Sequence, residues 1–240
     1  MTDTRLAELA ANLSHVEARL VAGCAAAGRS RADVTLVAVS KTWPAADVLR
    51  LASLGVRDFG ENYAAEAATK AASLAQSDVD VSWHFVGHLQ RNKARVVAGF
   101  AALVHSVDRT EVVAALDNAA SRSERVLDVL VQVSLDDARA ASGGPRGGVP
   151  TTEAARLAAD VARAHALRLR GVMGMPSAGR DPSAAFALLR EVALALQSDH
   201  PEAGIVSAGM SGDLETALRF GATHVRVGTA LFGFRPRVSH

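Results

Sequence analysis

Eight short apolar segments, each followed by a helical pattern or a turn, set the strongest limit on how this 240-residue sequence can fold. Short runs of β-branched and small apolar residues are typical of strands buried on both faces of a parallel sheet. The segments span residues 36–41, 55–59, 81–86, 102–106, 126–133, 167–173, 204–207 and 223–227. Alternating strands and helices predict parallel strands with right-handed crossovers. Eight units at this length favour a closed (β/α)8 TIM barrel over an open doubly wound sheet.

One further helix is predicted before the first strand. Its apolar positions step by three and four residues and are Leu6, Leu9, Leu13, Val16 and Leu20. Such spacing places them on one helix face, which can cap an end or a side of the sheet. Because composition does not change abruptly along the chain, residues 1–240 are predicted to form a single barrel domain.

Composition excludes several classes of protein. The net charge is +1 and only 4% of residues are aromatic, so neither a basic nucleic-acid surface nor a base-stacking platform is expected. No segment has the length of a membrane span or the pattern of a signal peptide. The single cysteine, Cys24, cannot form an internal disulfide, which fits a reducing compartment. We expect a soluble, cytoplasmic protein.

The first strand ends in a lysine, Lys41. Ligand sites of barrels and open sheets lie at the carboxyl ends of the strands. A lysine held against apolar residues loses its proton more readily, which prepares it to form a Schiff base with an aldehyde. The alternative is a lysine that only marks the end of the strand and points to solvent.

The loops after the seventh and eighth strands contain candidate phosphate ligands, Ser211 on the first loop and Gly228 and Thr229 on the second. Barrels often hold a phosphate with these two loops. Glycines let backbone N–H groups approach an anion, and the hydroxyls can donate hydrogen bonds. The segment 211–213 can also be read as a simple helix cap.

Two further polar residues stand near predicted strand ends. Arg226 lies between Val225 and Val227, so it faces the opposite side of the eighth strand. Its guanidinium either lies beside a ligand in the barrel mouth or forms an ordinary salt bridge or solvent contact. Asn62 follows the second strand and is either a polar ligand contact or a turn residue.

The histidines and the long loop yield no site of their own. His84 and His88 are four residues apart at a strand end, where that spacing gives no shared metal geometry, and His105 ends the fourth strand. We expect hydrogen-bonded histidines near the barrel mouth and no metal. The loop 136–150 lacks a P-loop pattern, and a loop of that length is usually functional or mobile.

These segments together resemble the pyridoxal 5′-phosphate (PLP) homeostasis proteins, a family related to the amino-terminal barrel of alanine racemase. The matching stretches are 37–41, 59–63, 83–93, 105–109, 169–173, 209–213 and 225–233. Two departures occur: Ala208 stands where the family often has methionine, and 140–143 replace the family's usual Lys-Ser-Gly.

The resemblance implies a role for each candidate residue. It implies that Lys41 carries PLP as a Schiff base, and that Ser211, Gly228 and Thr229 hold the phosphate. It further implies that Arg226 faces the pyridine nitrogen and that Asn62 lies near the ring.

The resemblance also favours a carrier over an enzyme. PLP enzymes commonly keep the ring nitrogen protonated with an acidic partner, and an arginine disfavours that proton. Alanine racemase takes its second base, a tyrosine, from a separate domain across a dimer, whereas the only tyrosine here is Tyr63 beside a barrel loop. We expect a monomeric PLP-binding homeostasis protein without a complete catalytic constellation, which holds PLP for buffering or for delivery to apo-enzymes. The alternatives are a weak amino-acid racemase and a lysine-dependent aldolase for sugar phosphates.

Overall fold

Eight parallel strands close into a barrel in the order in which they occur in the sequence, as the computed structural model shows. The structure describes residues 3–77, 79–135, 147–177, 179 and 181–234. The strands are β1 (Thr35–Val39), β2 (Asp58–Glu61), β3 (Ser82–Phe85), β4 (Leu103–Val107), β5 (Leu127–Ser134), β6 (Leu167–Met175), β7 (Ile205–Ser207) and β8 (His224–Val227). Pairing of β1 with β8 closes the barrel, with Val37 opposite Arg226. The predicted (β/α)8 barrel is confirmed.

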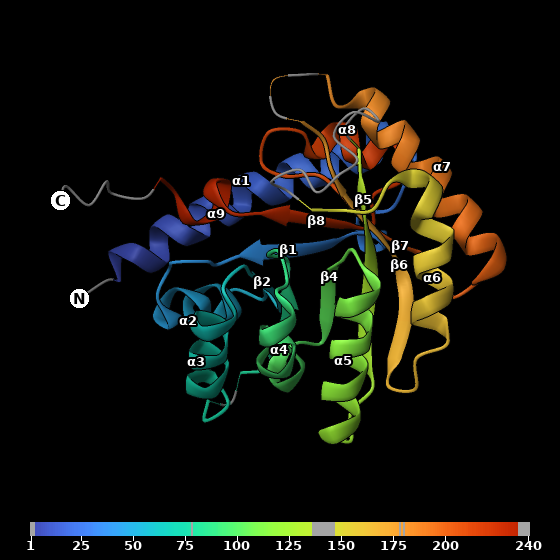
Figure 1. Ribbon diagram of the computed structural model, residues 1–240. Helices are drawn as coiled ribbons and strands as arrows, with labels where there is room; N and C mark the ends of the chain where they lie inside the picture. The colour runs from blue at the N-terminus through green and yellow to red at the C-terminus, as the bar shows by residue number, and fades with distance from the viewer. Residues whose placement is uncertain (1–2, 78, 136–146, 178, 180, 235–240) are drawn as a thin grey trace.

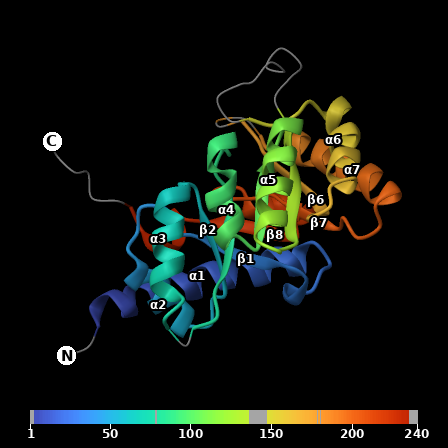
Figure 2. The same ribbon diagram turned by 60° about the horizontal axis from the view of Figure 1, so that its bottom comes forward.

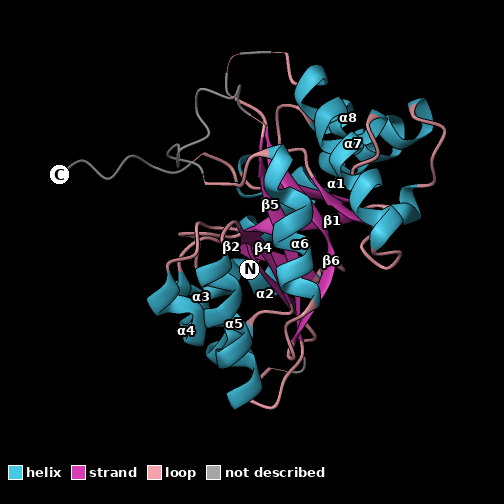
Figure 3. Ribbon diagram, turned by 45° about the vertical axis from the view of Figure 1, so that its right-hand side comes forward, coloured by secondary structure: helices cyan, strands magenta, loops and turns pink. Residues whose placement is uncertain are grey.

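Helices form an outer layer around the strands (Figures 1 and 3). They are α1 (Thr4–Ala26), α2 (Ala45–Ser53), α3 (Ala64–Leu74), α4 (Ala94–Phe100), α5 (Thr110–Arg122), α6 (Ala154–Ala162), α7 (Ser183–Asp199), α8 (Leu214–Arg219) and α9 (Thr229–Phe232). Within the described ranges, none of these helices has the length and apolar character needed to cross a lipid bilayer.

The predicted additional helix, α1, runs along the outside of the barrel (Figure 2). The Asp3 side chain caps its first turn by accepting from two backbone N–H groups. Polar side chains on α1 then reach the loops that follow β7 and β8. The Asn12 amide donates to the Leu231 carbonyl, and the Arg19 guanidinium donates to the Ser211 carbonyl. The helix therefore supports the side of the barrel on which the two candidate phosphate loops lie.

The buried side chains divide into an outer and an inner group. The outer group lies between the strands and the helices, and it includes Phe59, Leu116 and Phe186. A small separate cluster of Leu103, Leu130 and Met173 comes from β4, β5 and β6. Alternation along β4 places Leu103 and His105 on the same face. The inner face is thus apolar toward β5 and β6, whereas β2, β3 and β8 contribute polar groups to it.

Element boundaries differ from the predicted ones mainly at β2 and α6. The second strand begins at Asp58 rather than at residue 55, because Gly55 adopts φ +97° and ends the turn after α2. Glu61 belongs to the strand and not to the following turn. Helix α6 ends at Ala162, whereas the sequence pattern predicts a helix over 151–166. Most of the long loop, 136–146, and with it the departure at 140–143, lies outside the described residues.

Candidate functional site

Lys41 lies at the carboxyl end of β1, in a small cavity of about 160 Å³. The cavity is also lined by Gly228 and Thr229, which follow β8, and by Val39 and Trp43. Since β1 and β8 are paired, residues just past their ends are brought side by side. The structure therefore joins the predicted lysine to one of the two predicted phosphate loops.

A cluster of buried charges holds the backbone on both sides of Lys41. The Lys70 ammonium donates to the Ser40 carbonyl at 2.8 Å, and to Glu61 and Glu66 at 2.7 Å each. Glu61 also accepts from the Ser40 hydroxyl at 2.7 Å. On the other side, the Thr42 N–H donates to Glu66 at 2.5 Å. Thr42 has φ +65°, an uncommon backbone conformation for a β-branched residue. These bonds fix the turn from which Lys41 projects.

Burial raises the pKa of the Glu61 carboxyl, while hydrogen bonds from Lys70 and Ser40 act in the opposite direction. The side chain of Glu61 is fully buried and that of Lys70 is 7% exposed. One carboxylate oxygen, Oε2, is buried with no hydrogen-bond partner among the described residues. The ionised form of the Glu61 carboxyl matches these contacts, because the Lys70 ammonium and the Ser40 hydroxyl both donate to its Oε1 atom.

The two candidate phosphate loops touch each other. The Ser211 hydroxyl, after β7, accepts a hydrogen bond from the Ala230 N–H, after β8, at 3.4 Å. Gly209, two residues before Ser211, adopts φ +90°, and a Cβ there would lie 2.7 Å from Ala217. A glycine is therefore required for the chain to turn from β7 toward α8. The loops after β7 and β8 are thus in contact, and the loop after β8 contributes Gly228 and Thr229 to the lining of the Lys41 cavity.

Arg226 points into the barrel and is 5% exposed. Its guanidinium donates to the Ser207 hydroxyl at 2.5 Å and to the Gly174 carbonyl at 3.2 Å. Burial lowers the pKa of Arg226 to about 10, so the side chain is still a cation at neutral pH. Neither an ordinary salt bridge nor a solvent contact describes this residue. The direction of Arg226 agrees with the alternation argument from the sequence.

His84 and His105 lie deeper than expected, whereas His88 is exposed. His105 is in the middle of β4 and not at its end, is fully buried, and has its Nδ1 atom 2.8 Å from the Ser207 hydroxyl. Its Nε2 atom lies 2.9 Å from Nδ1 of His84, which is 3% exposed. Burial, more than the nearby charges, holds the pKa of His105 well below its ordinary value. Within the described ranges, no group of three or more histidine, cysteine or acidic side chains has the geometry of a metal site.

Asn62 follows β2, the neighbour of β1, so it stands one strand away from Lys41. Gly87, after β3, packs against its backbone: a Cβ on Gly87 would lie 2.2 Å from the Asn62 carbonyl oxygen. The cavity around Lys41 is not lined by Asn62, Ser211 or Arg226. Asn62 follows β2 and Arg226 belongs to β8, the two strands that pair with β1, whereas Ser211 follows β7. Sequence reasoning missed Ser207 and the Lys70 cluster, and it expected His105 to be hydrogen-bonded without identifying its partners, because all these partners are distant in the sequence.

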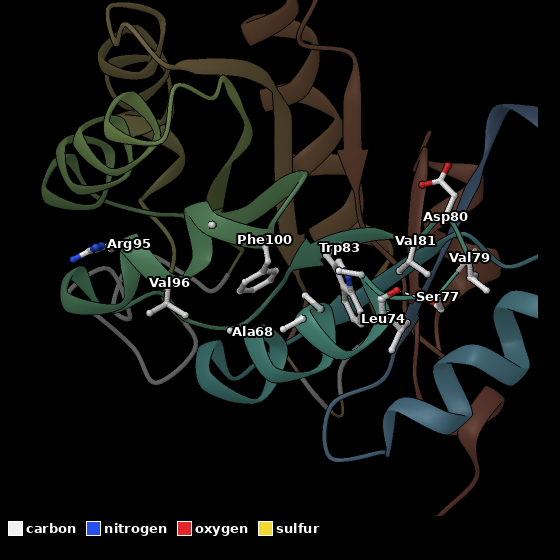
Figure 4. Close-up of a pocket in the computed structure, with 14 residues that line it drawn as sticks. Ala68, Leu74, Ser77, Val79, Asp80, Val81, Trp83, Arg95, Val96 and Phe100 are labelled. Carbon is white, nitrogen blue, oxygen red and sulfur yellow. Dashed lines mark hydrogen bonds between the residues drawn. The ribbon is translucent and has the colours of Figure 1, made fainter.

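A much larger cavity of about 890 Å³ lies on the outside of the barrel, between α3 and α4 (Figure 4). Most of its lining is apolar, including Leu74, Trp83 and Phe100. None of the predicted site residues lines it. We place the candidate site at the smaller cavity, because reactive and anion-binding groups meet there, whereas size alone indicates no chemistry.

Comparison with known proteins gives a consistent result. A model of the family described as alanine racemase, N-terminal domain, matches residues 6–236. The chain is 42% identical to the pyridoxal phosphate homeostasis protein of Mycobacterium leprae, over 95% of this chain and 93% of that protein. It is 37% identical to the Escherichia coli protein of the same name, over 95% of this chain and 97% of that protein.

A similar solved structure is that of PipY from Synechococcus elongatus with PLP bound. It superposes with a TM-score of 0.80 at 32% identity and covers 94% of this chain and all of that one. The family model spans nearly the whole chain, and the relatives match over nearly their whole length. This chain belongs to the alanine racemase N-terminal domain family and, within it, to the pyridoxal phosphate homeostasis proteins.

Proposed function

We propose that this protein binds PLP as a Schiff base on Lys41 and serves in PLP homeostasis, holding the cofactor for buffering or for delivery to apo-enzymes. Membership of the family and the PLP-bound structure of PipY support the choice of cofactor. The observation that carries the proposal is that Lys41, Gly228 and Thr229 line one cavity at the carboxyl end of the barrel. An amine and an anion-binding loop are the two groups that an aldehyde bearing a phosphate requires.

The small number of lysines strengthens the assignment. The sequence contains three, Lys41, Lys70 and Lys93. Lys70 is buried and donates to two carboxylates, so its amine is held as a charged hydrogen-bond donor. Lys93 is exposed and lies in the turn before α4. Lys41 alone among the three lines the cavity beside β8.

The covalent step needs no other reactant. The lone pair of the neutral Lys41 amine attacks the aldehyde carbon, and a carbon–nitrogen bond forms. The aldehyde oxygen leaves as water with the two amine protons, so that a C=N bond replaces the C=O bond and nothing is oxidised or reduced. Hydrolysis reverses the step and returns the free aldehyde. A reversible linkage of this kind suits a protein that stores a reactive aldehyde and later releases it.

The remaining candidate residues fit the rest of the cofactor. We expect Ser211, Gly228 and Thr229 to hold the phosphate, because the Ser211 and Thr229 loops are in contact through Ala230. We expect Arg226 to donate toward the ring nitrogen from inside the barrel, and Asn62 to stand near the ring. PLP supplies an electron-withdrawing ring when it is bound. Arg226 stays charged at neutral pH and disfavours a proton on that nitrogen, which weakens this effect.

The same argument makes a role other than catalysis the better proposal. A weak amino-acid racemase is the alternative, with Tyr63 as the second base. Tyr63 is 54% exposed and stands at the start of α3. Racemisation of alanine faster than by free PLP would support the alternative.

The test is borohydride reduction of the PLP-loaded protein, followed by peptide mass mapping. We expect the reduced adduct on Lys41, and its loss in Lys41→Ala. Lys93→Ala is the matched control and should keep the adduct, since Lys93 is an exposed lysine outside the site. Label on Lys93 or Lys70 in place of Lys41 would contradict the proposal. Trapping of a sugar phosphate but not of PLP would revive the aldolase reading.

We further propose that the protein acts in the cytoplasm as a monomer and passes PLP to apo-enzymes. Light scattering should then give a mass near 24.9 kDa with and without PLP. Mixing the loaded protein with a PLP-dependent apo-enzyme should restore that enzyme's activity. Activation no faster than by the same amount of free PLP would leave storage, without delivery, as the function.

A further inference from the structure

A chain of hydrogen bonds continues from Arg226 across the inside of the barrel to the amino-terminal end of β2. Arg226 donates to Ser207, which lies 2.8 Å from His105 Nδ1. The opposite nitrogen of His105 lies 2.9 Å from His84 Nδ1. His84 Nε2 in turn lies 2.9 Å from Asp58 Oδ1. The two ends of the chain carry opposite charges, and three groups without a fixed charge separate them.

The end groups determine the direction of every hydrogen bond between them. A guanidinium can only donate, and an ionised carboxylate can only accept. His84 must therefore donate from Nε2 to Asp58, which leaves Nδ1 of the neutral ring as an acceptor. His105 then donates from Nε2 to His84 and accepts at Nδ1, so the Ser207 hydroxyl donates to His105. In this state every member from Arg226 to His84 donates to the next group along the chain, and the Asp58 carboxylate only accepts.

One added proton reverses part of this chain. A second proton on His84 makes both of its ring nitrogens donors, so His105 Nε2 becomes an acceptor. The proton of neutral His105 then moves to Nδ1 and points at Ser207. The Ser207 hydroxyl accepts from both Arg226 and His105, and its own proton loses His105 as a partner. A change at His84 thus reaches the hydroxyl that Arg226 contacts.

Of the two histidines in the chain, His84 is the one in contact with a carboxylate. Its Nε2 atom lies 2.9 Å from Asp58 Oδ1, and a carboxylate beside a ring nitrogen favours the charged form of a ring. His105 is more deeply buried and faces His84, His224 and Arg226. His224 from β8 lies with its ring centroid 6.1 Å from that of His84, and burial lowers its pKa to about 4. His224 is therefore neutral near neutral pH.

Only the Asp58 end of the chain is open to solvent. The Asp58 side chain is 30% exposed, whereas that of His84 is 4% exposed. Asp58 also lines a surface cavity of about 440 Å³ with residues of α1 and of the segment before β1. Protons can therefore enter at the amino-terminal end of the barrel, opposite to the end where Lys41 lies.

We propose that Arg226 is oriented by four positioning residues, Asp58, His84, His105 and Ser207. Through them, a change of protonation at the Asp58 end of the chain alters the hydrogen bonds around Arg226 at the ligand site. The ligand affected by this chain is an aromatic heterocycle whose ring nitrogen accepts a hydrogen bond from Arg226. The inference rests on the proposed function, in which that heterocycle is PLP. Its first test needs no cofactor, so the two can fail separately.

The first experiment is ¹⁵N NMR of the histidine side chains in the cofactor-free protein at mildly alkaline pH. We expect both His84 and His105 to be protonated at Nε2 and unprotonated at Nδ1. Signals are assigned with His84→Asn and His105→Asn. In Asp58→Asn the fixed acceptor is lost, and the fraction of His84 protonated at Nε2 should fall. Protonation of His105 at Nδ1 in the wild-type protein under these conditions would overturn the proposed direction of the chain.

The second experiment is a pH titration of the visible absorption band of the PLP-loaded protein. The variant is placed at Asp58, because Asp58 is the most exposed member of the chain, with a side chain that is 30% exposed. Asp58→Asn should shift the midpoint by about one pH unit, since it removes a charge next to His84. The matched control is Asp128→Asn. Asp128 is a similarly exposed carboxylate, 26% exposed, on β5, where it pairs with Arg168.

The outcomes separate the two proposals. If the wild-type protein gives no visible band and no reduced adduct, the proposed function fails, and the NMR result still decides the direction of the chain. If the band forms but Asp58→Asn titrates like the wild type and Asp128→Asn, the chain does not reach the site. In that case the inference is wrong and the proposed function stands. A shift of the titration midpoint that is equal in Asp58→Asn and Asp128→Asn would indicate a general charge effect, and this result would also overturn the inference.

Discussion

Two buried polar regions lie on opposite faces of the barrel wall, and each supports one of the groups proposed to hold PLP. On the outer face, Lys70 joins Glu61 and Glu66 and fixes the turn that carries Lys41. On the inner face, three groups without a fixed charge separate Arg226 from Asp58. In the first region opposite charges are in direct contact. In the second they meet only through a chain of hydrogen bonds.

This difference determines what each region can do. An ion pair in direct contact has one arrangement of donors and acceptors, because an ammonium only donates and a carboxylate only accepts. Histidines and a serine can each exchange donor and acceptor roles, so the inner region has more than one arrangement of protons. We infer that the outer region fixes geometry and that the inner region can respond to pH. The predictions below test this contrast.

The largest expected effect follows removal of Lys70. Lys70→Met leaves the fully buried carboxylate of Glu61 without its cation, which should lower the free energy of unfolding by about 3–5 kcal/mol. Urea denaturation measures the change. The exposed Lys93→Met is the control and should change stability little. Adding Glu61→Leu to Lys70→Met should restore much of the loss, because it removes the unpaired charge. If Lys70→Met lowers the free energy of unfolding no more than Lys93→Met does, the outer region does not fix the turn that carries Lys41 in the way proposed.

The second effect concerns acid and comes from the inner face. Burial lowers the pKa of His224 from 6.5 to about 4. A lowered histidine pKa means that the unfolded chain takes up the proton first. The stability from neutral His224 is therefore complete above pH 6.5 and is lost as pH falls toward 4. The loss is about 3 kcal/mol at its limit. His224→Met should lose less stability than the wild type between these pH values. Equal acid sensitivity of the two proteins would contradict this.

The third effect is smaller and separates a bonded hydroxyl from an unbonded one. Ser207→Ala leaves a donor of Arg226 without its acceptor, which should cost about 1–3 kcal/mol. Ser106→Ala is a matched control, since Ser106 is equally buried on β4 and its hydroxyl has no partner within the described ranges. Thermal unfolding of both variants measures the difference. If the two substitutions cost the same, the contact with Ser207 does not stabilise Arg226.

The sequence allowed prediction of the barrel because its eight apolar segments each encode a strand locally. Lys41 and the loops after β7 and β8 were also predictable, since position along a strand determines which end of the barrel a residue reaches. The chain of hydrogen bonds that begins at Arg226 could not be predicted from the sequence. Ser207 and His105 are 102 residues apart in the sequence, and only closure of the barrel brings them to 2.8 Å. Glu61 lies beyond the predicted strand 55–59, and its pairing with Lys70 appears only when α3 packs on β2.

The smallest expected effect concerns a pair of charges at the surface. Arg19 on α1 pairs with Glu215 on α8 at 2.7 Å and also donates to the Ser211 carbonyl. The two side chains are 25% and 45% exposed, so solvent screens their attraction. Arg19→Met should therefore lower the free energy of unfolding by only about 1 kcal/mol or less. The difference from the wild type should shrink further at high salt, which screens exposed charges. Lys70→Met should retain most of its effect under the same conditions, because its partner is buried. Equal salt sensitivity of the two variants would mean that burial is not what distinguishes the cluster under Lys41 from an ordinary surface pair.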